Sequence, residues 1–398
     1  MSVPEHVLVI GAGLAGLRTV QGLRRAGYEG RLSLVGAEEH LPYDRPPLSK
    51  QYLAGEWDRS RIELASEDDL EELGVRTHLG RAAVALRPGE VELDDGATLH
   101  ADAIVLAVGV TSRTLDGQPG SIHVLRSVDE SDGLRDALAD ASSLLVVGAG
   151  FVGAEVASTA VDRGLAVTVV ETAPVPMERL LGERGGTLVA RLMTDAGIDL
   201  RTGVSVASLT ATGAELSDGS TVSADETVVG IGGRLDLGWL EGSGPDLSGG
   251  IPCDERGRVE GLDGVWAVGD AAAWTDPRTG DRARLEHWTS AAEQAAAVAA
   301  DIAGGDPPPA TVPFFWSDQF GLKIQLIGRP GAADEVLTLH GDGLDGGAVK
   351  GTVLGYLRGD TLVAVAGFGA ARLIARYRRP LSDGVDRAAL LEFRDTLS

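Results

Sequence analysis

Cysteine is almost absent from this sequence, since Cys253 is the one thiol in 398 residues. A single thiol excludes an internal disulfide, a cluster of metal-binding thiolates and a redox-active dithiol. Cys253 stands in the strand-like segment GGIPCDERG, where we expect a small buried apolar residue. Chemistry that needs a pair of thiols is therefore closed to this chain.

Basic residues and long apolar runs are also scarce. Lys and Arg number 35 against 59 Asp and Glu, and the field of the resulting -24 formal charge repels nucleic acid and anionic membranes. No segment approaches the roughly 20 apolar residues of a membrane helix. The apolar start breaks into glycines with no basic region before it. We expect a cytoplasmic protein with no nucleic-acid and no membrane partner.

The chain is long and rich in glycine. A chain of 398 residues is too long for one core, which predicts two or three domains. Hydrophobic residues, at 43%, suffice for large cores, and the 55 glycines indicate many tight turns or close backbone approaches.

A first group of glycines follows an apolar segment near the N-terminus. The stretch HVLVIGAGLAGLRTVQGLRRAGYEGRLSLVG predicts a strand, a turn, an amphipathic helix and a second strand, the βαβ unit that binds dinucleotides. Gly11 permits the tight turn, Gly13 lets a phosphate approach the backbone, and Gly16 lets the helix pack on the strand. Leu14 and Ala15 open the helix whose N-terminus would face the pyrophosphate.

An acidic residue is expected where the second strand of this unit ends, because a carboxylate there holds a ribose hydroxyl. Gly36 and Ala37 come first, so this role is left to Glu38 or Glu39. The spacing alone does not choose between these two acids.

The same pattern recurs in SLLVVGAGFVGAEVASTAVDRGLAVTVVE. Gly148, Gly150 and Gly153 follow a predicted strand, with Phe151 and Val152 between the last two glycines. A second fingerprint indicates a second dinucleotide. The simplest pair is a tightly held flavin and a diffusible nicotinamide.

Glu171 ends the next strand at the offset expected for the ribose-binding acid. Its carboxylate would bind the 2′-hydroxyl of the adenosine ribose and repel a 2′-phosphate, which favours NADH over NADPH. Nearby Arg179 tempers that preference.

The segment DGVWAVGD supports the flavin. It predicts a buried strand that ends in Gly269 and Asp270 and leads into a small-residue helix, AAAW. Asp270 could then accept a hydrogen bond from a ribityl hydroxyl beside a helix N-terminus. By composition alone the segment fits any turn from a strand into a helix.

Taken together, GAGLAG, RPPLSK, GAGFVGAE, AVGD and FFWSDQFGLKIQLIG resemble the oxygenase-coupled ferredoxin reductases, which belong to the two-dinucleotide-binding flavoprotein superfamily. The resemblance covers nearly the whole chain, and RPPLSK and FWSDQ are more specific than the glycine turns. It implies an α/β fold with two Rossmann-like dinucleotide-binding domains, one for FAD and an inserted one for NAD, and a C-terminal α/β domain.

The implied FAD-binding domain comprises residues 1–117 and 235–310, the NAD-binding domain residues 118–234, and the C-terminal domain residues 311–398. The segments IVLAVG and VVGIGG indicate where the chain crosses between the first two. The link AGGDPPPATVPF fits the last boundary, because consecutive prolines neither continue a helix nor pair in a sheet.

The segment LPYDRPPLSK stands where related disulfide reductases carry their redox-active cysteines. Pro46 and Pro47 predict the start of a helix, because their fixed φ suits a first turn. The resemblance implies that Lys50, on this helix, points at the flavin N5 region. Glu155, early in the helix after the second glycine turn, is the expected partner that keeps the ammonium charged. The alternative is a solvated Lys50 and a Glu155 that merely suits a helix N-terminus.

The resemblance implies further cofactor contacts. Tryptophans 288 and 316 would shield the isoalloxazine, although both could equally be core aromatics, and Arg45 and Arg126 would lie near FAD unless they form surface ion pairs. His287 is expected to be structural. Trp288 and Trp316 are thus expected cofactor contacts, and the remaining ones are Pro46, Ala83, Ala107, Gly109 and Gly232.

The implied activity is hydride transfer from NADH to FAD, followed by single-electron transfers to a small acidic iron–sulfur ferredoxin that serves a cytochrome P450 monooxygenase or a dioxygenase. No general acid or nucleophile is needed, because the cofactors carry the chemistry. Alternatives are an NADH oxidase, which would need a reactive cysteine, and a non-enzymatic, NADH-sensing flavoprotein like apoptosis-inducing factor.

An acidic chain can attract an acidic ferredoxin only through a local patch of opposite charge. The segment ARLIARYRRP holds Arg372, Arg376, Arg378 and Arg379, which we expect to form part of the docking face. The alternative is a solvated charged helix that balances an acidic protein.

Overall fold

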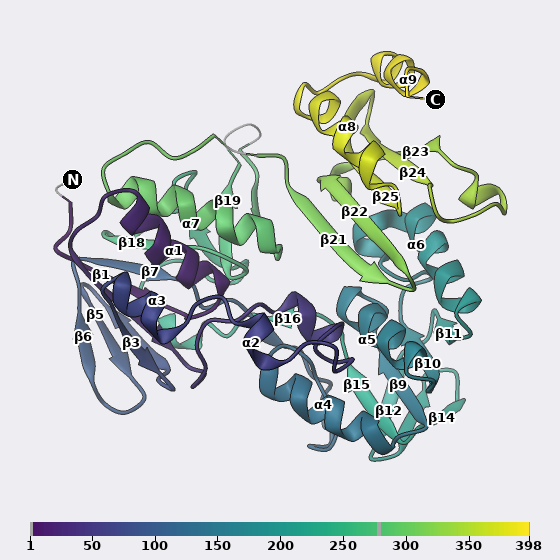
Figure 1. The fold of residues 1–398 in the computed structure, drawn as a ribbon, viewed down its shortest axis with the longest axis horizontal. Coiled ribbons are helices and arrows are strands. Elements are labelled where there is room, and N and C mark those ends of the chain that lie inside the picture. Colours follow the sequence, from purple (N-terminus) through teal and green to yellow (C-terminus); the bar gives the residue numbers. More distant parts are fainter. Residues whose placement is uncertain (1–2, 277–279, 310, 398) are drawn as a thin grey trace. The chain divides into compact units, whose positions relative to one another are not determined.

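The computed structural model describes residues 3–276, 280–309 and 311–397, and its contacts divide the chain into two compact units (Figure 1). The first unit comprises Met1–Asp44, Arg59–Thr111 and Arg234–Thr311. The second comprises Arg45–Asp58, Ser112–Gly233 and Val312–Ser398. The division into three domains is finer than these two units, and its boundaries stay a prediction.

A five-stranded parallel sheet, in the order β18-β7-β1-β2-β3, forms the centre of the first unit. Helices α1 and α7 lie side by side against the core that contains Val7 and Val9 (Figure 1). Leu8 and Ile10, which alternate with them along β1, belong to a second core. The sheet is therefore buried on both faces, as parallel sheets are. The elements are β1 (His6–Ile10), α1 (Leu14–Arg25), β2 (Arg31–Gly36), β3 (Val75–Leu79), β7 (Ala103–Leu106), β18 (Val265–Ala267) and α7 (Trp288–Ile302).

Smaller elements complete the first unit. The antiparallel β4-β5-β6 sheet contributes Leu86, Val91 and Leu93 to the second core. The elements are α2 (Arg59–Ile62), α3 (Glu67–Glu72), β4 (Ala83–Arg87), β5 (Glu90–Leu93), β6 (Thr98–His100), η2 (Gly238–Leu240), β17 (Ile251–Cys253), β19 (Ala272–Thr275) and β20 (Arg282–Arg284), with β8 (Thr111–Ser112) and β16 (Gly233–Arg234) at the unit boundaries.

The segment AAAW is a strand and not the predicted helix. As β19 it pairs in parallel with β17 and antiparallel with β20. Alanine is the strongest helix former, but helix propensity is a weak preference that tertiary contacts override. Here the flanking strands supply hydrogen-bond partners, and Ala272 is completely buried in the second core. Asp270 therefore precedes a strand and does not stand at a helix N-terminus.

A four-stranded parallel sheet, in the order β11-β10-β9-β15, lies at the centre of the first part of the second unit. Helix α5 follows β9 directly, as the second glycine pattern predicts. The elements are α4 (Val128–Asp140), β9 (Ser143–Val147), α5 (Phe151–Asp162), β10 (Ala166–Glu171), α6 (Glu178–Asp195), β11 (Asp199–Thr202), β12 (Val206–Thr210), β13 (Gly213–Leu216), β14 (Thr221–Ser223) and β15 (Glu226–Val229). These two parallel sheets confirm the predicted α/β class with two dinucleotide-binding folds.

A five-stranded antiparallel sheet, in the order β21-β22-β25-β24-β23, forms the C-terminal part of the second unit (Figure 1). Helix α8, drawn in yellow, packs Ile374 and Tyr377 into the core of this sheet. The elements are β21 (Phe314–Gln319), β22 (Leu322–Gly328), η3 (Pro330–Ala332), β23 (Glu335–His340), η4 (Gly343–Asp345), β24 (Val353–Arg358), β25 (Thr361–Phe368), α8 (Ala371–Ser382) and α9 (Arg387–Asp395).

The segment after the first βαβ unit forms a shorter helix than predicted. Pro46 and Pro47 open a single turn of 3-10 helix, η1 (Pro46–Ser49), and Lys50 caps its C-terminal end with φ near -128°. The helix ends there because Lys50 leaves helical geometry. Buried hydrogen bonds then hold the turn, since Ser131 and Thr159 donate to the carbonyls of Leu48 and Ser49.

No helix in the described ranges is long and apolar enough to cross a membrane. The longest of them, α6, has 18 residues and carries charged side chains such as Glu183 and Arg191. This finding agrees with the lack of long apolar runs in the sequence.

A buried carboxylate ties three parts of the first unit together. Asp301, on α7, has a side chain only 1% exposed and accepts from Arg256, Arg258 and the Trp266 indole. Burial alone would raise the pKa of Asp301, but the hydrogen bonds from Arg258, Trp266 and Arg256 outweigh it and hold the pKa below its usual value. Asp301 therefore stabilises the fold in its ionised form.

We expect Asp301→Asn to lower the free energy of unfolding by about 2 kcal/mol at neutral pH, because the arginines lose a charged acceptor. A lowered folded-state pKa means that the stabilisation is complete above the unfolded value near pH 4 and is lost as the pH falls further. The difference between wild type and variant, measured by urea unfolding with tryptophan fluorescence, should therefore shrink in acid. Asp306→Asn is the control, since that side chain is 95% exposed and also contacts Arg256. Equal losses in the two variants would contradict this account.

Candidate functional site

The three glycines of the first turn have two different roles: two allow close contacts within the protein, and one leaves space for a ligand. A Cβ on Gly11, which has φ +112°, would lie 2.2 Å from the Ala107 carbonyl oxygen, and one on Gly16 would lie 1.9 Å from that of Gly11. Gly13 differs, because within the described residues a Cβ there would meet nothing within 4 Å. The protein's own backbone thus requires Gly11 and Gly16, while Gly13 leaves room beside the start of α1 for an approaching phosphate.

The second glycine turn, between β9 and α5, repeats this geometry. A Cβ on Gly148 would lie 2.5 Å from the Gly230 carbonyl oxygen, and one on Gly153 would lie 2.0 Å from that of Gly148. At Gly150 the nearest described atom would be 4.0 Å away. Both turns therefore fit a dinucleotide whose pyrophosphate meets the N-terminus of the following helix.

Gly13 and Gly150 are also the N-cap residues of α1 and α5, and in the described structure neither helix start is capped by a side chain. The N–H groups of a first helical turn lack partners within the helix. Helix starts of this kind can bind an anion through the backbone, even in a protein of formal charge -24.

Glu171 is tied to the second glycine turn. Its carboxylate, at the end of β10, accepts from the N–H of Ala149 at 2.7 Å and from that of Ala173 at 2.9 Å. These bonds place the acid beside the turn that would hold the pyrophosphate, where the ribose-binding acid is expected. Arg179 is exposed on α6.

The corresponding acids of the first fingerprint differ in their surroundings. Glu38 accepts a hydrogen bond from the Tyr43 hydroxyl, whereas Glu39 is exposed and packs beside Gly80. Glu38 is thus the acid held by a neighbouring side chain. Its contact with a ribose stays a prediction.

Other predicted FAD contacts gather near the first glycine turn. Gly269 adjoins Ala15, since a Cβ on Gly269 would lie 3.1 Å from the Ala15 Cβ, and its N–H donates to Gln294 of α7. Ala107 lies against Gly11. The ends of β1, β7 and β18 thus meet at the edge of the sheet where ligands of α/β folds bind.

The remaining predicted residues of the first unit lie on separate elements. Trp288 begins α7 and donates from its indole nitrogen to Asp44 at 2.7 Å. The Asp270 carbonyl accepts from Arg284, Ala83 begins β4, and Gly109 follows β7 with φ +66°. Their contacts with a cofactor stay predictions.

Lys50 is largely enclosed in a polar cluster within the second unit and is not solvated. Its ammonium lies 2.7 Å from Glu155 Oε2, with side-chain exposures of 12% for Lys50 and 6% for Glu155. The predicted pairing is therefore found, and the surface alternative is wrong. Ser49 donates to Glu155 Oε2 at 2.5 Å, and Ser317 of β21 donates to Oε1 at 2.6 Å.

Sequence reasoning missed the two serines. Ser49 and Ser317 both stand inside the distinctive segments RPPLSK and FWSDQ, which was the available signal. A serine among apolar and aromatic residues has no preferred partner in the sequence, so only the fold shows that both reach one carboxylate.

Arg45 and Arg126 lie together in the second unit. The Arg45 guanidinium donates to the Arg126 carbonyl at 2.6 Å, and the Arg126 N–H donates to Glu130 in the first turn of α4. Pro46 begins η1 next to them, and Gly232 follows β15 with φ +102°. Whether these residues contact a cofactor stays a prediction.

Trp316, on β21, lies in a cluster of aromatic rings and cations that come from β21, β22 and α8. Its ring stacks on Phe314 at 5.7 Å, the Lys323 ammonium lies 6.0 Å from its ring, and the Arg378 guanidinium lies 5.0 Å from Phe314. Such contacts are attractive when a cation stands over a ring face. Helix α8 is thereby joined to β21.

The predicted arginine cluster lies on the exposed face of α8, with Arg372, Arg376, Arg378 and Arg379 all exposed. Ile374 and Tyr377 face the core from the same helix. Arg379 lies 3.5 Å from Asp383, while its side chain stays 91% exposed.

Cys253 is completely buried in β17, as predicted. Burial, helped by the nearby Asp254 carboxylate, raises the pKa of its thiol to about 12. A thiol in such surroundings remains protonated and unreactive at neutral pH.

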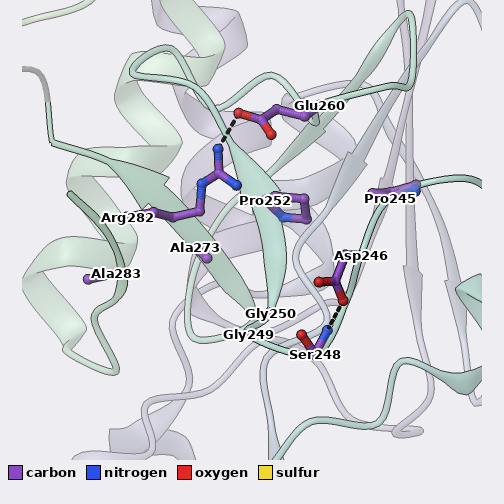
Figure 2. A pocket seen from close by; sticks show the side chains of 10 residues that line it. All are labelled: Pro245, Asp246, Ser248, Gly249, Gly250, Pro252, Glu260, Ala273, Arg282 and Ala283. Carbon is purple, nitrogen blue, oxygen red and sulfur yellow. Dashed lines mark hydrogen bonds and ion pairs between the residues drawn. The ribbon is translucent and has the colours of Figure 1, made fainter. Parts of the chain in front are cut away.

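A cavity of about 320 Å³ opens elsewhere in the first unit, between the loop that contains Asp246 and the β17-β19-β20 sheet (Figure 2). Its charged groups are paired internally, since Arg282 bridges to Glu260 and Asp246 accepts from the Ser248 N–H, as the dashed lines in Figure 2 show. None of the predicted site residues lines it in the described structure. The cavity is therefore separate from the candidate cofactor sites.

Comparison with known families supports the two-fingerprint interpretation. Residues 5–295 match the model of the pyridine nucleotide-disulphide oxidoreductases, and residues 314–395 match a reductase C-terminal domain. The chain therefore belongs to the pyridine nucleotide-disulphide oxidoreductase family, and this membership implies FAD and NAD binding.

Several relatives are similar over most of their length. The ferredoxin reductase component of chlorobenzene dioxygenase from Cupriavidus sp. strain PS12 is 37% identical over 98% of this chain and 96% of the relative. Putidaredoxin reductase from Pseudomonas putida is 30% identical over 92% of this chain and 89% of the relative.

Two solved structures share the fold. The putidaredoxin reductase in a covalent complex with putidaredoxin superposes with a TM-score of 0.92, 28% identity and coverage of 99% of this chain and 98% of that chain. The ferredoxin reductase for the CYP199A2 system of Rhodopseudomonas palustris superposes with a TM-score of 0.91 and 30% identity. The match covers 99% of this chain and 100% of that chain. These similarities confirm the predicted resemblance.

We expect Glu171→Ala to lower the preference for NADH over NADPH roughly tenfold or more, because the variant loses a charged acceptor for the ribose hydroxyl and a repulsive charge. The preference is measured as the ratio of kcat/KM for the two nucleotides. Glu215→Ala, at the exposed position of the otherwise buried strand β13, is the control and should leave the ratio unchanged. An unchanged ratio in Glu171→Ala would show that this acid does not select the nucleotide.

Proposed function

We propose that the chain is an NADH-dependent ferredoxin reductase that supplies electrons to a cytochrome P450 or a dioxygenase. Two dinucleotide folds, a buried lysine–glutamate pair and relatives that are ferredoxin reductases over most of their length support this function. The observation that carries the proposal is the Lys50–Glu155 pair, in the segment where related disulfide reductases carry their cysteines.

The residues present fit FAD at the first glycine turn and NADH at the second. Gly13 and Gly150 leave room for the phosphates, and Glu171 stands beside the second turn. FAD, when bound, accepts a hydride from NADH and passes its electrons on singly. With Cys253 inert and no second thiol in the sequence, electrons on a bound flavin would have to leave for an external acceptor.

In this proposal the Lys50 ammonium stabilises the negative charge that the flavin gains on reduction, the electrostatic contribution that enzymes use most. An ammonium buried alone would cost several kcal/mol. Glu155 offsets this cost because its carboxylate lies 2.7 Å away. The Lys50 side chain, only 12% exposed, thus lies in surroundings largely closed to water.

The two alternatives meet different obstacles. An NADH oxidase that works through a cysteine has no suitable thiol, because Cys253 is buried and its pKa is raised. A non-enzymatic, NADH-sensing flavoprotein would use the same two folds. It would differ by slow flavin reduction and a persistent charge-transfer complex.

We further propose that the arginines of α8 take part in docking the ferredoxin. Four exposed cations on one helix reverse the field of an otherwise acidic chain and would guide an acidic iron–sulfur protein to this face. The solved covalent complex of a putidaredoxin reductase of this fold with putidaredoxin supports a protein partner for this chain.

The function is tested with the FAD-loaded protein by stopped-flow reduction with NADH and by steady-state reduction of candidate ferredoxins. Rapid flavin reduction followed by ferredoxin reduction is expected. Lys50→Met should slow flavin reduction roughly a hundredfold, the usual effect of losing one electrostatic stabiliser. Lys350→Met, on an exposed lysine, is the control. Slow reduction by wild type with a lasting charge-transfer band would favour the sensing role, and an unaffected Lys50→Met would remove Lys50 from the reaction.

The docking surface is tested by Arg372→Glu with Arg376→Glu. We expect the KM for ferredoxin to rise about tenfold and the salt dependence of turnover to weaken, because steering charges are lost. Reduction of ferricyanide should be unchanged. Arg25→Glu with Arg358→Glu makes the same change of net charge at exposed sites elsewhere. If both double variants lose ferredoxin turnover equally, the effect belongs to total charge and not to α8.

A further inference from the structure

The Glu155 carboxylate is held from both of its oxygens. Lys50 and Ser49, both at the end of η1, donate to Oε2. Ser317, from the C-terminal sheet, donates to Oε1 at 2.6 Å. An ionised carboxylate only accepts hydrogen bonds, and all three of these groups are donors.

The direction of the Ser317 hydrogen bond is determined by its neighbour. Gln319 Nε2 donates to Ser317 Oγ at 3.0 Å, so the hydroxyl is already an acceptor there. A serine hydroxyl has one proton to give. That proton therefore goes to Glu155 Oε1, and Ser317 itself is completely buried.

Strand β21 is firmly fixed against α5 on both sides of Ser317. The Phe315 ring lies 4.0 Å from the Phe151 ring, and the Phe320 N–H donates to Ser158 Oγ at 2.8 Å. The hydroxyl of Ser317 is thus held in place by the strand as well as by its own contacts. Ser317 itself has one acceptor and one donor, although the Gln319 Oε1 that belongs to the same cluster is buried without a partner in the described structure.

We propose that Ser317 is a positioning residue for the reaction, which orients Glu155 so that Oε2 faces Lys50 and the ammonium stays in place. Without the hydroxyl, Oε1 would be buried without this donor, and a buried acceptor left unsatisfied is costly. The carboxylate would then rotate towards other donors, and the Lys50–Glu155 contact would loosen. This inference rests on the proposed role of the pair and adds the C-terminal sheet to the reaction site.

The test compares Ser317→Thr with Ser317→Val in the FAD-loaded full chain. These two side chains have the same shape and differ in the hydroxyl alone. We expect Ser317→Val to slow flavin reduction by NADH roughly tenfold relative to Ser317→Thr, since one charge-assisted hydrogen bond is lost. The midpoint potential of the bound flavin should fall in Ser317→Val and be retained in Ser317→Thr, because a displaced ammonium stabilises reduced flavin less.

A double-mutant cycle separates positioning from general damage. With Glu155→Gln as background, Ser317→Val should cause no further loss, because the group it orients has lost its charge. Ser158→Ala is the structural control, since it removes the neighbouring contact between α5 and Phe320, the residue after β21, and leaves Glu155 untouched. It should keep both the rate and the potential of wild type.

The outcomes distinguish this inference from the proposed function. If Lys50→Met and Glu155→Gln slow flavin reduction while Ser317→Val equals Ser317→Thr in rate and potential, the positioning role is wrong and the proposed function stands. If Lys50→Met and Glu155→Gln have no effect, the proposed role of the Lys50–Glu155 pair is wrong, and the positioning role of Ser317 is wrong with it, while ferredoxin reduction by the wild type still tests the proposed function. Should the added methyl groups prevent folding, Ser317→Ala replaces them, and its potential, compared with that of wild type, decides in the same way.

Discussion

In the second unit, the arrangement of η1, α5 and β21 around Lys50 depends on the buried carboxylate of Glu155. Glu155 places a carboxylate where its side chain is 6% exposed, and such a group is tolerated only if it is paired and fully hydrogen-bonded. Its donors come from η1 and from β21, which are far apart in the sequence. The charge therefore requires these two segments to meet on α5, and their meeting encloses Lys50.

The two glycine turns obey a different constraint, which is steric. In each, two glycines are demanded by close approach of the protein's own backbone, as the positions of Gly11 and Gly148 illustrate. The middle glycine of each turn faces open space instead. In both turns, two of the three glycines are required by the fold and one by the approaching ligand. This shared requirement explains why the glycine pattern predicts a dinucleotide site well.

Predictions from the sequence succeeded where a local rule governs the outcome. The glycine turns, the strand that buries Cys253 and the acid Glu171 beside its turn all follow from short-range spacing. Predictions failed where contacts with residues distant in the sequence determine the local structure. The segment AAAW became β19 because two strands flank it, and the proline-led helix stopped after one turn because buried side chains fix the chain at Leu48 and Ser49.

The sequence by itself determined the fold class, the two nucleotide fingerprints and the absence of a thiol relay, because each follows from residue identity and local spacing. It also indicated that Lys50 needs an acidic partner. Only the tertiary structure decided that Ser49 and Ser317 share that partner with Lys50. The physical reason is that a hydroxyl carries no signature of its acceptor, so its role depends on which carboxylate the packed chain brings within 3 Å.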